Sequence, residues 1–167
     1  MMERVVGWAF ALTLAVLLLF EAGSVFLGPQ PNAVFGLIAA RSGLAFFEPG
    51  MRYVTGVLEV LAVILLILPR TRAAGAGLAL AVVLGALAFH LSPWLGISLP
   101  QPAALSAALA AHKTSTEIAQ MNLPTDHGAM FMLAVAIAVL SVAVLLTERA
   151  KLKAAMPKPK RPAGAFA

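Results

Sequence analysis

The chain contains no cysteine and very few charged side chains. Without cysteine, its own residues cannot form disulfides, thiolate metal sites or iron–sulfur clusters. Only 11% of the 167 residues are charged, whereas 61% are hydrophobic and the mean hydropathy is +0.94. Soluble domains are about 45–50% apolar and about 25% charged, so this composition indicates an integral membrane protein.

Acidic residues are scarcer than basic ones, 7 against 12, and the net charge is +5. The excess of Lys and Arg lies at the ends of apolar segments and near the end of the chain. Basic residues in those places are typical of membrane topology signals and of attraction to anionic lipid headgroups. We therefore expect these basic residues to contact a lipid bilayer and not a nucleic acid.

Four long apolar segments predict four membrane-spanning helices, because about 20 helical residues cross a bilayer core of about 30 Å. The predicted spans cover residues 5–27, 53–69, 73–92 and 128–147. They must be helical because a backbone in lipid has to satisfy its own hydrogen bonds. A cleaved signal peptide is the alternative for the first segment, but its uncharged core is long for that and its cleavage-site fit is poor.

Two further segments are too short or too polar to span. A short helix is predicted over residues 33–47, because they follow Asn32, a residue type that favours the N-cap of a helix. A second helix is predicted over the alanine-rich residues 103–121, and Thr125 and Asp126 are expected to cap the fourth span. The predicted fold class is therefore all-α, an integral membrane four-helix bundle with short non-spanning helices on the outer face.

The distribution of Lys and Arg also predicts the orientation. If both termini are cytoplasmic, nine basic residues lie inside and three outside. The inner ones are Arg4, Arg70, Arg72 and six between Arg149 and Arg161, and the outer ones are Arg41, Arg52 and Lys113. Residues 1–148 are expected to form one transmembrane domain. Residues 149–167 are rich in Lys, Arg and Pro, which predicts a basic, disordered cytoplasmic tail.

Two glutamates lie inside the predicted spans, where an acidic residue costs about 2.5–3.5 kcal/mol on insertion scales and often marks a functional site. Glu21 and Glu59 are expected at similar depth in the outer half of the membrane. Glu59 shares a stripe with Arg52, Thr55 and Gly56, although Arg52 lies about 10 Å away along the axis, too far for a direct pair without water. This predicts a buried polar pocket, open to the outside, for a proton or a headgroup. The alternative is that each glutamate is protonated and hydrogen-bonded between helices.

The third span carries one polar candidate and a stripe of small residues. His90 is a further candidate for the pocket, and the alternative is a side chain that extends to the membrane interface. Gly77, Ala81 and Gly85 form a small-xxx-small seam that favours close approach of another helix. No two histidines within a span have zinc or haem spacing, so no metal is expected. No nucleophile, phosphate-loop or dinucleotide motif marks a catalytic residue.

The run from Arg52 to Leu91 resembles the DoxX-like family of small bacterial membrane proteins. The residues that carry the resemblance are Gly56, Glu59, Pro69, Thr71, Arg72, Gly75 and His90. It extends over about residues 5–147 and implies a four-helix protein of the bacterial inner membrane. Some members of this family are associated with quinone-linked oxidation and with membrane-bound oxidative-stress complexes, which makes a quinone the cofactor to consider. The resemblance transfers no catalytic residues.

Three functional hypotheses remain open. The chain is a non-catalytic membrane subunit or scaffold of a quinone-linked redox complex, with a quinone pocket near Glu59. Alternatively, it is a small proton-coupled transporter in which Glu21 or Glu59 is the proton-coupling carboxylate. In the third hypothesis it is a lipid-embedded scaffold whose glutamates only fix helix contacts. These hypotheses allow membrane or peripheral redox proteins and further copies of the chain as partners, and we do not expect enzymatic activity from the chain alone.

Overall fold

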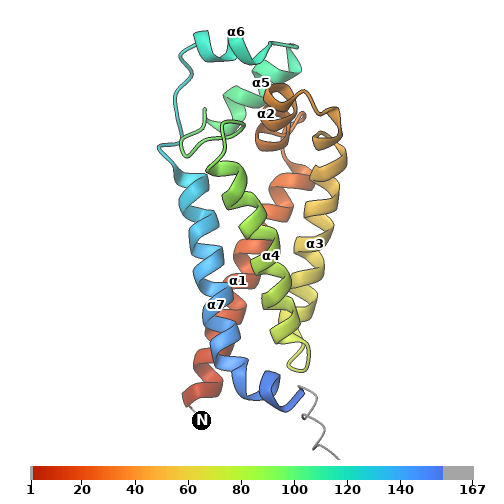
Figure 1. The fold of residues 1–167 in the computed structure, drawn as a ribbon, viewed down its shortest axis with the longest axis vertical. Helices are drawn as coiled ribbons and strands as arrows, with labels where there is room; N and C mark the ends of the chain where they lie inside the picture. Colours follow the sequence, from red (N-terminus) through yellow and green to blue (C-terminus); the bar gives the residue numbers. More distant parts are fainter. Residues whose placement is uncertain (1, 156–167) are drawn as a thin grey trace, which may run out of the picture.

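The computed structural model describes residues 2–155. Its elements are α1 (Met2–Leu27), α2 (Ala33–Ser42), the 3-10 helix η1 (Ala45–Phe47), α3 (Gly50–Ile67), α4 (Arg72–His90), α5 (Pro102–Ala110), α6 (Ser115–Gln120) and α7 (Ala129–Ala155). Four of these helices, α1, α3, α4 and α7, are long and apolar enough to cross a membrane. Figure 1 shows the long helices running alongside one another, with the short helices gathered at one end. This is the all-α bundle that the sequence predicts.

The long helices form a ring in which each packs mainly against two neighbours. α1 packs against α3 and α7, and α4 packs against the same two helices. Consecutive long helices run in opposite directions, and α1 begins at the end of the bundle where α7 finishes (Figure 1). We call this the inner end, after the predicted orientation, and the end that carries α2, α5 and α6 the outer end. The core of the bundle consists of small and branched apolar side chains such as Leu14, Leu66, Ala79 and Val144.

Three observed spans agree closely with the predicted ones, whereas the second begins at Ala45 and not at residue 53. The observed spans cover Val5–Leu27, Ala45–Ile67, Arg72–His90 and Ala129–Arg149. α7 continues as a helix to Ala155, so residues 149–155 belong to this helix and not to a disordered tail as predicted. The rest of the predicted tail, residues 156–167, lies outside the described residues.

α3 and α4 touch near the inner end and separate toward the outer end. At the inner end, the hydroxyl of Thr71 donates a hydrogen bond of 2.9 Å to the carbonyl of Leu65. Gly75 approaches α3 so closely that a Cβ there would lie 2.7 Å from the backbone nitrogen of Leu66, so only glycine fits. Ala86 lies on the same face of α4, about three turns further along, and is exposed. The two helices therefore form a V that opens toward the outer end (Figure 1).

The outer end is covered by a layer that we call the outer cap, formed by α2, η1, α5, α6 and the loops between them. α2 packs against η1, α5 and α6. As predicted, Asn32 caps α2, because its side chain accepts hydrogen bonds from the backbone of Val34 and Phe35. The layer has an apolar core of its own, which consists of Ala33, Leu37, Ile38, Leu95, Leu99, Leu105, Ala108, Leu109 and Ile118.

The single helix predicted over residues 103–121 is wrong, since the chain forms two helices there. After α5, His112 adopts a φ of 55°, which ends the helix. The Thr114 hydroxyl then accepts a hydrogen bond of 3.2 Å from the backbone N–H of Glu117. In return, the Glu117 carboxylate accepts one of 2.8 Å from the backbone N–H of Thr114. This reciprocal capping box starts α6, and its Thr-x-x-Glu spacing is visible in the sequence.

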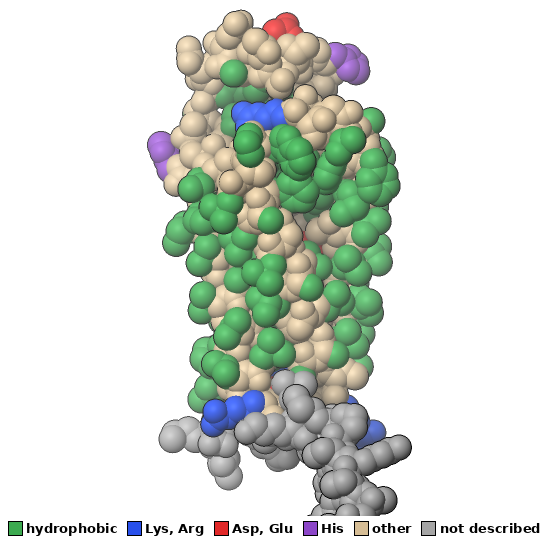
Figure 2. Space-filling view, viewed as in Figure 1, with side chains coloured by type: hydrophobic (Ala, Val, Ile, Leu, Met, Phe, Trp, Pro, Cys, Tyr) green, Lys and Arg blue, Asp and Glu red, His purple; other side chains and the backbone are tan. Residues whose placement is uncertain are grey.

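The lateral surface of the bundle is apolar and its two ends are charged. In Figure 2, hydrophobic side chains cover the long helices, and Lys and Arg gather at the inner end. Arg70 and Arg149 are exposed at the inner end, and Arg41 and Lys113 are exposed on the outer cap. An apolar band between two charged ends is expected of a protein that spans a bilayer. The chain is therefore a membrane protein.

Candidate functional site

A cavity of about 680 Å³ lies in the outer half of the bundle, where α3 and α4 have separated. All four long helices and the outer cap contribute to its lining. Most of this lining is apolar or aromatic and includes Met51, Phe35, Phe47, Phe89 and Met130. The polar side chains that also line it are Glu21, Ser24, Asn32, Thr55, Glu59, His90, Ser106 and Asp126. An apolar cleft with a few polar groups is typical of small-molecule sites.

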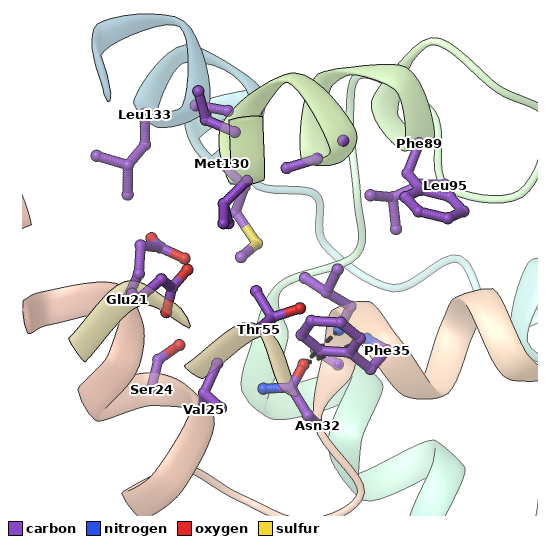
Figure 3. Close-up of a pocket in the computed structure, with 18 of the residues that line it drawn as sticks. Glu21, Ser24, Val25, Asn32, Phe35, Thr55, Phe89, Leu95, Met130 and Leu133 are labelled. Carbon is purple, nitrogen blue, oxygen red and sulfur yellow. Dashed lines mark hydrogen bonds between the residues drawn. The ribbon is translucent and has the colours of Figure 1, made fainter. Parts of the chain in front are cut away.

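The two intramembrane glutamates meet in this cavity. Glu21 on α1 and Glu59 on α3 both line it and are close enough for their charges to interact. Figure 3 shows Glu21 at the cavity wall, near Ser24 and facing Leu133 of α7. Glu59 is only 7% exposed, and its Oε2 atom has no hydrogen-bond partner among the described residues. Such a buried carboxyl oxygen is uncommon, and it can bind a group brought into the cavity.

The cavity has one polar wall and one apolar wall. Ser24 lies about one turn beyond Glu21 on α1, and Thr55 lies about one turn beyond Glu59 on α3, both toward the outer end. Each hydroxyl can donate and accept hydrogen bonds. Across the cavity, the middle parts of α4 and α7 contribute apolar side chains, among them Leu133. The polar wall is therefore formed by α1 and α3, and two of the three pocket residues predicted on α3, Thr55 and Glu59, belong to it.

His90 lies at the outer rim of the cavity and is 5% exposed. Its Nδ1 atom is 2.8 Å from the carbonyl oxygen of Gly96. Because a carbonyl only accepts, Nδ1 must carry the proton of this bond, and Nε2 of the neutral ring is then an acceptor. The ring also makes an edge contact with Phe131, with centroids 5.7 Å apart. The side chain of His90 is therefore enclosed by protein and holds the loop after α4.

Asp126 fixes the opposite side of the rim. Its carboxylate accepts backbone hydrogen bonds from Leu99 at 2.8 Å, Gly128 at 2.9 Å and Met130 at 3.1 Å. Burial alone would raise the pKa of Asp126, but these three hydrogen bonds and the nearby His90 together lower it. The carboxylate thus caps the start of α7, as predicted, and ties it to the loop after α4.

Arg52, which was predicted to share the pocket with Glu59, does not line the cavity. It is 1% exposed, and its Nε atom lies 3.2 Å from the carboxylate of Glu48. Its Nη1 atom donates a hydrogen bond of 3.3 Å to the carbonyl of Val25, and the guanidinium lies 4.4 Å from the ring centroid of Tyr53. The ion-pair partner of Arg52 is therefore Glu48 and not Glu59. This pair was not predicted from the sequence, although Glu48 and Arg52 have the i,i+4 spacing that favours ion pairs.

The small residues of α3 and α4 do not all serve helix contacts. A Cβ at Gly56 would lie 2.7 Å from the side chain of Val25, so Gly56 packs against α1 as predicted. At Gly77 and Gly85 a Cβ would meet nothing within 4 Å, and Ala81 is exposed. The predicted seam is therefore wrong at these two glycines within one described chain, because a Cβ on either would reach no neighbouring helix. Ala81 and Gly85 instead line the cavity.

A second buried polar cluster, which the sequence did not reveal, lies at the inner end, outside the cavity. Arg72 on α4 and Glu148 on α7 form an ion pair of 3.1 Å, with side chains 5% and 6% exposed. Arg72 also donates to the carbonyl of Leu66 on α3, and its guanidinium lies 3.9 Å from the ring centroid of Trp8 on α1. The cluster thus joins all four long helices. Its two charges are 76 positions apart in the sequence, a separation that gives no spacing signal.

The side chains of the cavity favour binding of one class of molecule. No Lys or Arg lines the cavity, so an anionic phosphate headgroup would find no fixed cation there. Groups of three or more His, Cys, Asp or Glu that could hold a metal ion are absent from the described residues. The polar wall can hydrogen-bond a neutral head, and the apolar wall can cover a hydrophobic body. The arrangement therefore suits an uncharged amphiphile.

The chain was also compared with known proteins. No protein-family model matches it, and neither the curated proteins nor the solved structures include a significant match. The cavity and its polar wall therefore carry the functional argument.

Proposed function

We propose that the protein is a quinone-binding membrane subunit or scaffold of a redox complex, without catalytic activity of its own. The observation that carries this proposal is the unpartnered, buried carboxyl of Glu59 in a cavity of about 680 Å³ with an apolar wall opposite. A quinone has matching chemistry, because its carbonyl oxygens accept hydrogen bonds from a protonated carboxyl while its ring and tail are apolar. The volume lies within the range of about 300–1,000 Å³ that is typical of small-molecule sites.

The resemblance to the DoxX-like family supports the same proposal. Glu59 and His90, two of the residues that carry the resemblance, both line the cavity. Gly56 and Gly75 make close helix contacts, and Arg72 forms the buried ion pair at the inner end. The resemblance therefore falls on residues that shape the bundle and its cavity, and membership of that family is part of our proposal.

The proposed setting is the bacterial inner membrane, with both termini in the cytoplasm. This orientation keeps nine basic residues inside and three outside. Because the chain has no cysteine to ligate an iron–sulfur cluster, we assign electron transfer to a membrane or peripheral partner protein. Our proposal gives this chain the task of holding the quinone where such a partner can reach it.

The test is to purify the full chain in mild detergent, extract it with organic solvent and quantify ubiquinone and menaquinone by chromatography. We expect close to one quinone per chain in the wild type and a large loss in Glu59→Leu. Glu117→Gln, at an exposed glutamate of the outer cap, is the matched control and should keep its quinone. The proposal is wrong if the wild type carries no quinone and also fails to bind added short-chain ubiquinone.

A proton-coupled transporter is the second candidate, favoured by the interacting pair Glu21 and Glu59 in one cavity. Two coupled carboxyls can take up and release a proton as a ligand comes and goes. The probe is ethidium, a lipophilic cation that carboxylates attract, in proteoliposomes with an imposed pH gradient. Transport should vanish in the double variant Glu21→Gln, Glu59→Gln. Absence of transport in the wild type, or its survival in the double variant, would eliminate this candidate.

A further inference from the structure

The face of α4 that meets α3 changes along the helix. Near the inner end, Gly75 touches the backbone of α3. Further out on the same face, Val82 and Ala86 line the cavity, and Ala86 is exposed. Opposite them, Leu58 and Thr55 of α3 line the cavity and are half-buried. A gap thus separates the outer halves of α3 and α4, and Figure 2, viewed as Figure 1, shows the surface hollowed between them.

The α4 edge of this gap carries very small side chains. Ala81, Gly85 and Ala86 are all exposed and all line the cavity. A Cβ at Gly85 would meet nothing within 4 Å, so open space lies beside the helix there. On α1, the exposed residues that line the cavity are the bulky Phe20 and Ser24. An apolar chain can therefore lie across α4 at Gly85 and Ala86 without displacing a side chain.

The outer cap covers the outer end of the cavity. This layer has its own apolar core above the cavity. Its loops are held at the rim by His90, bound to the carbonyl of Gly96, and by Asp126, bound to the backbone of Leu99. The gap between α3 and α4 instead lies on the apolar lateral surface, which faces lipid in a spanning protein. A molecule dissolved in the bilayer can therefore reach Glu59 through this gap.

We propose that the cavity takes its ligand sideways from the outer leaflet, through the gap between α3 and α4. In the bound state the polar ring lies against Glu59 and Thr55, and the single apolar tail remains in the gap across Gly85 and Ala86. This inference rests on the proposed function and deepens it, because it assigns the route and requires a long-tailed amphiphile. It also gives the small-residue stripe of α4 a role other than helix contact.

The two tryptophans of the chain provide a binding assay. Trp8 lies in the inner-end cluster, whereas the ring of Trp94 is 6.1 Å from that of Phe89, which lines the cavity. In a Trp8→Phe background, Trp94 is the single fluorophore near the cavity, and quinones quench tryptophan fluorescence. The full chain in lipid nanodiscs would be titrated with decylubiquinone, which has a ten-carbon tail, and with the corresponding tailless ubiquinone ring.

The variants separate the gap from the rest of the stripe. Gly85→Leu and Ala86→Leu place an isobutyl group where the tail would lie, and each should weaken decylubiquinone binding by at least about tenfold. The tailless ring should lose less than about threefold in either variant. Gly77→Leu is the matched control, because it lies on the same stripe in open space but does not line the cavity, and it should bind as the background does. Circular dichroism and gel filtration check that each variant folds.

Equal decylubiquinone affinity in all variants would overturn the lateral route while leaving the quinone site intact. If the background binds neither quinone, the proposed function fails and the route fails with it. If Gly77→Leu and Gly85→Leu weaken binding alike and also dissociate an oligomer, the stripe is a contact between copies of the chain, and the inference is wrong. A tenfold loss confined to Gly85→Leu and Ala86→Leu supports it.

Discussion

The buried polar residues of this bundle fall into two kinds, which differ in whether the protein itself supplies their partners. Arg52 is paired with Glu48, and Arg72 with Glu148, in each case at about hydrogen-bond distance. The Oε2 atom of Glu59 has no such partner within the described chain. Because an isolated polar group is unfavourable to bury, a residue held in an ion pair is explained by the fold, whereas our proposal gives Glu59, for which no ion pair is seen in the described chain, a ligand as its partner.

Glu59→Leu should separate binding from stability. Removing a buried carboxyl with an unpartnered oxygen relieves its desolvation penalty, so the thermal midpoint should stay the same or rise. Quinone affinity should nevertheless fall at least about tenfold, since the polar ring loses its hydrogen-bond donor. Differential scanning fluorimetry and the Trp94 titration measure the two quantities. A lower thermal midpoint in Glu59→Leu that Glu59→Gln restores would instead favour a purely structural glutamate.

Arg72→Met should destabilise the protein by about 3–5 kcal/mol, because it removes the cation of a buried ion pair together with its contacts to Leu66 and Trp8. The double variant Arg72→Met, Glu148→Leu should recover most of that loss, since two apolar side chains need no charge partner. The free energy of unfolding in a detergent titration gives the double-mutant cycle. An effect of Arg72→Met below about 1 kcal/mol would contradict the burial of this pair.

At the scale of elements, the sequence predicts what depends on local composition. The four spans follow from runs of apolar residues, and Asn32 and Asp126 cap helices as their residue types and positions suggest. The opening between α3 and α4 could not be predicted, because it depends on how tightly Gly75 meets a helix that precedes it. The break between α5 and α6 was open to prediction, since Thr114 and Glu117 have the spacing of a capping box.

The capping box of α6 makes a prediction for pH. Hydrogen bonds from the backbone and hydroxyl of Thr114, and from Lys113, lower the pKa of Glu117 from 4.5 to about 2. A lowered pKa in the folded state means that the carboxylate contributes its stabilisation above pH 4.5 and loses it as the pH falls to about 2. The chemical shift of the Ile118 amide should follow this transition by NMR, with a midpoint near 2. A midpoint near 4.5 would mean that the box does not hold Glu117.

At the scale of the whole molecule, the outer cap and the V of α3 and α4 act together. The cap alone would close the outer end, and the V alone would leave a cleft open to outer water. Their combination gives a cavity covered toward the water and accessible from the lateral apolar surface. The sequence predicts that Glu21 and Glu59 lie at similar depth. It does not predict the outer cap over the cavity or the gap between α3 and α4, because both arise from contacts between distant segments.

The function also depends on which end faces the cytoplasm, and introduced cysteines can determine this because the chain has none. Arg70→Cys lies at the inner end and Lys113→Cys on the outer cap, and both positions are exposed. If the proposed setting and orientation hold, a maleimide that cannot cross the inner membrane of bacteria expressing the chain should label Lys113→Cys in intact cells, and Arg70→Cys only after permeabilisation.

The two cysteine variants are matched, because each removes one exposed basic residue. From nine basic residues inside and three outside, Arg70→Cys leaves 9 − 1 = 8 against 3, and Lys113→Cys leaves 9 against 3 − 1 = 2. Neither change reverses the excess that sets the orientation, so the variants report the topology of the natural chain. The opposite labelling pattern would place the opening between α3 and α4 in the cytoplasmic leaflet. Glu59 would then receive its ligand and its proton from that side.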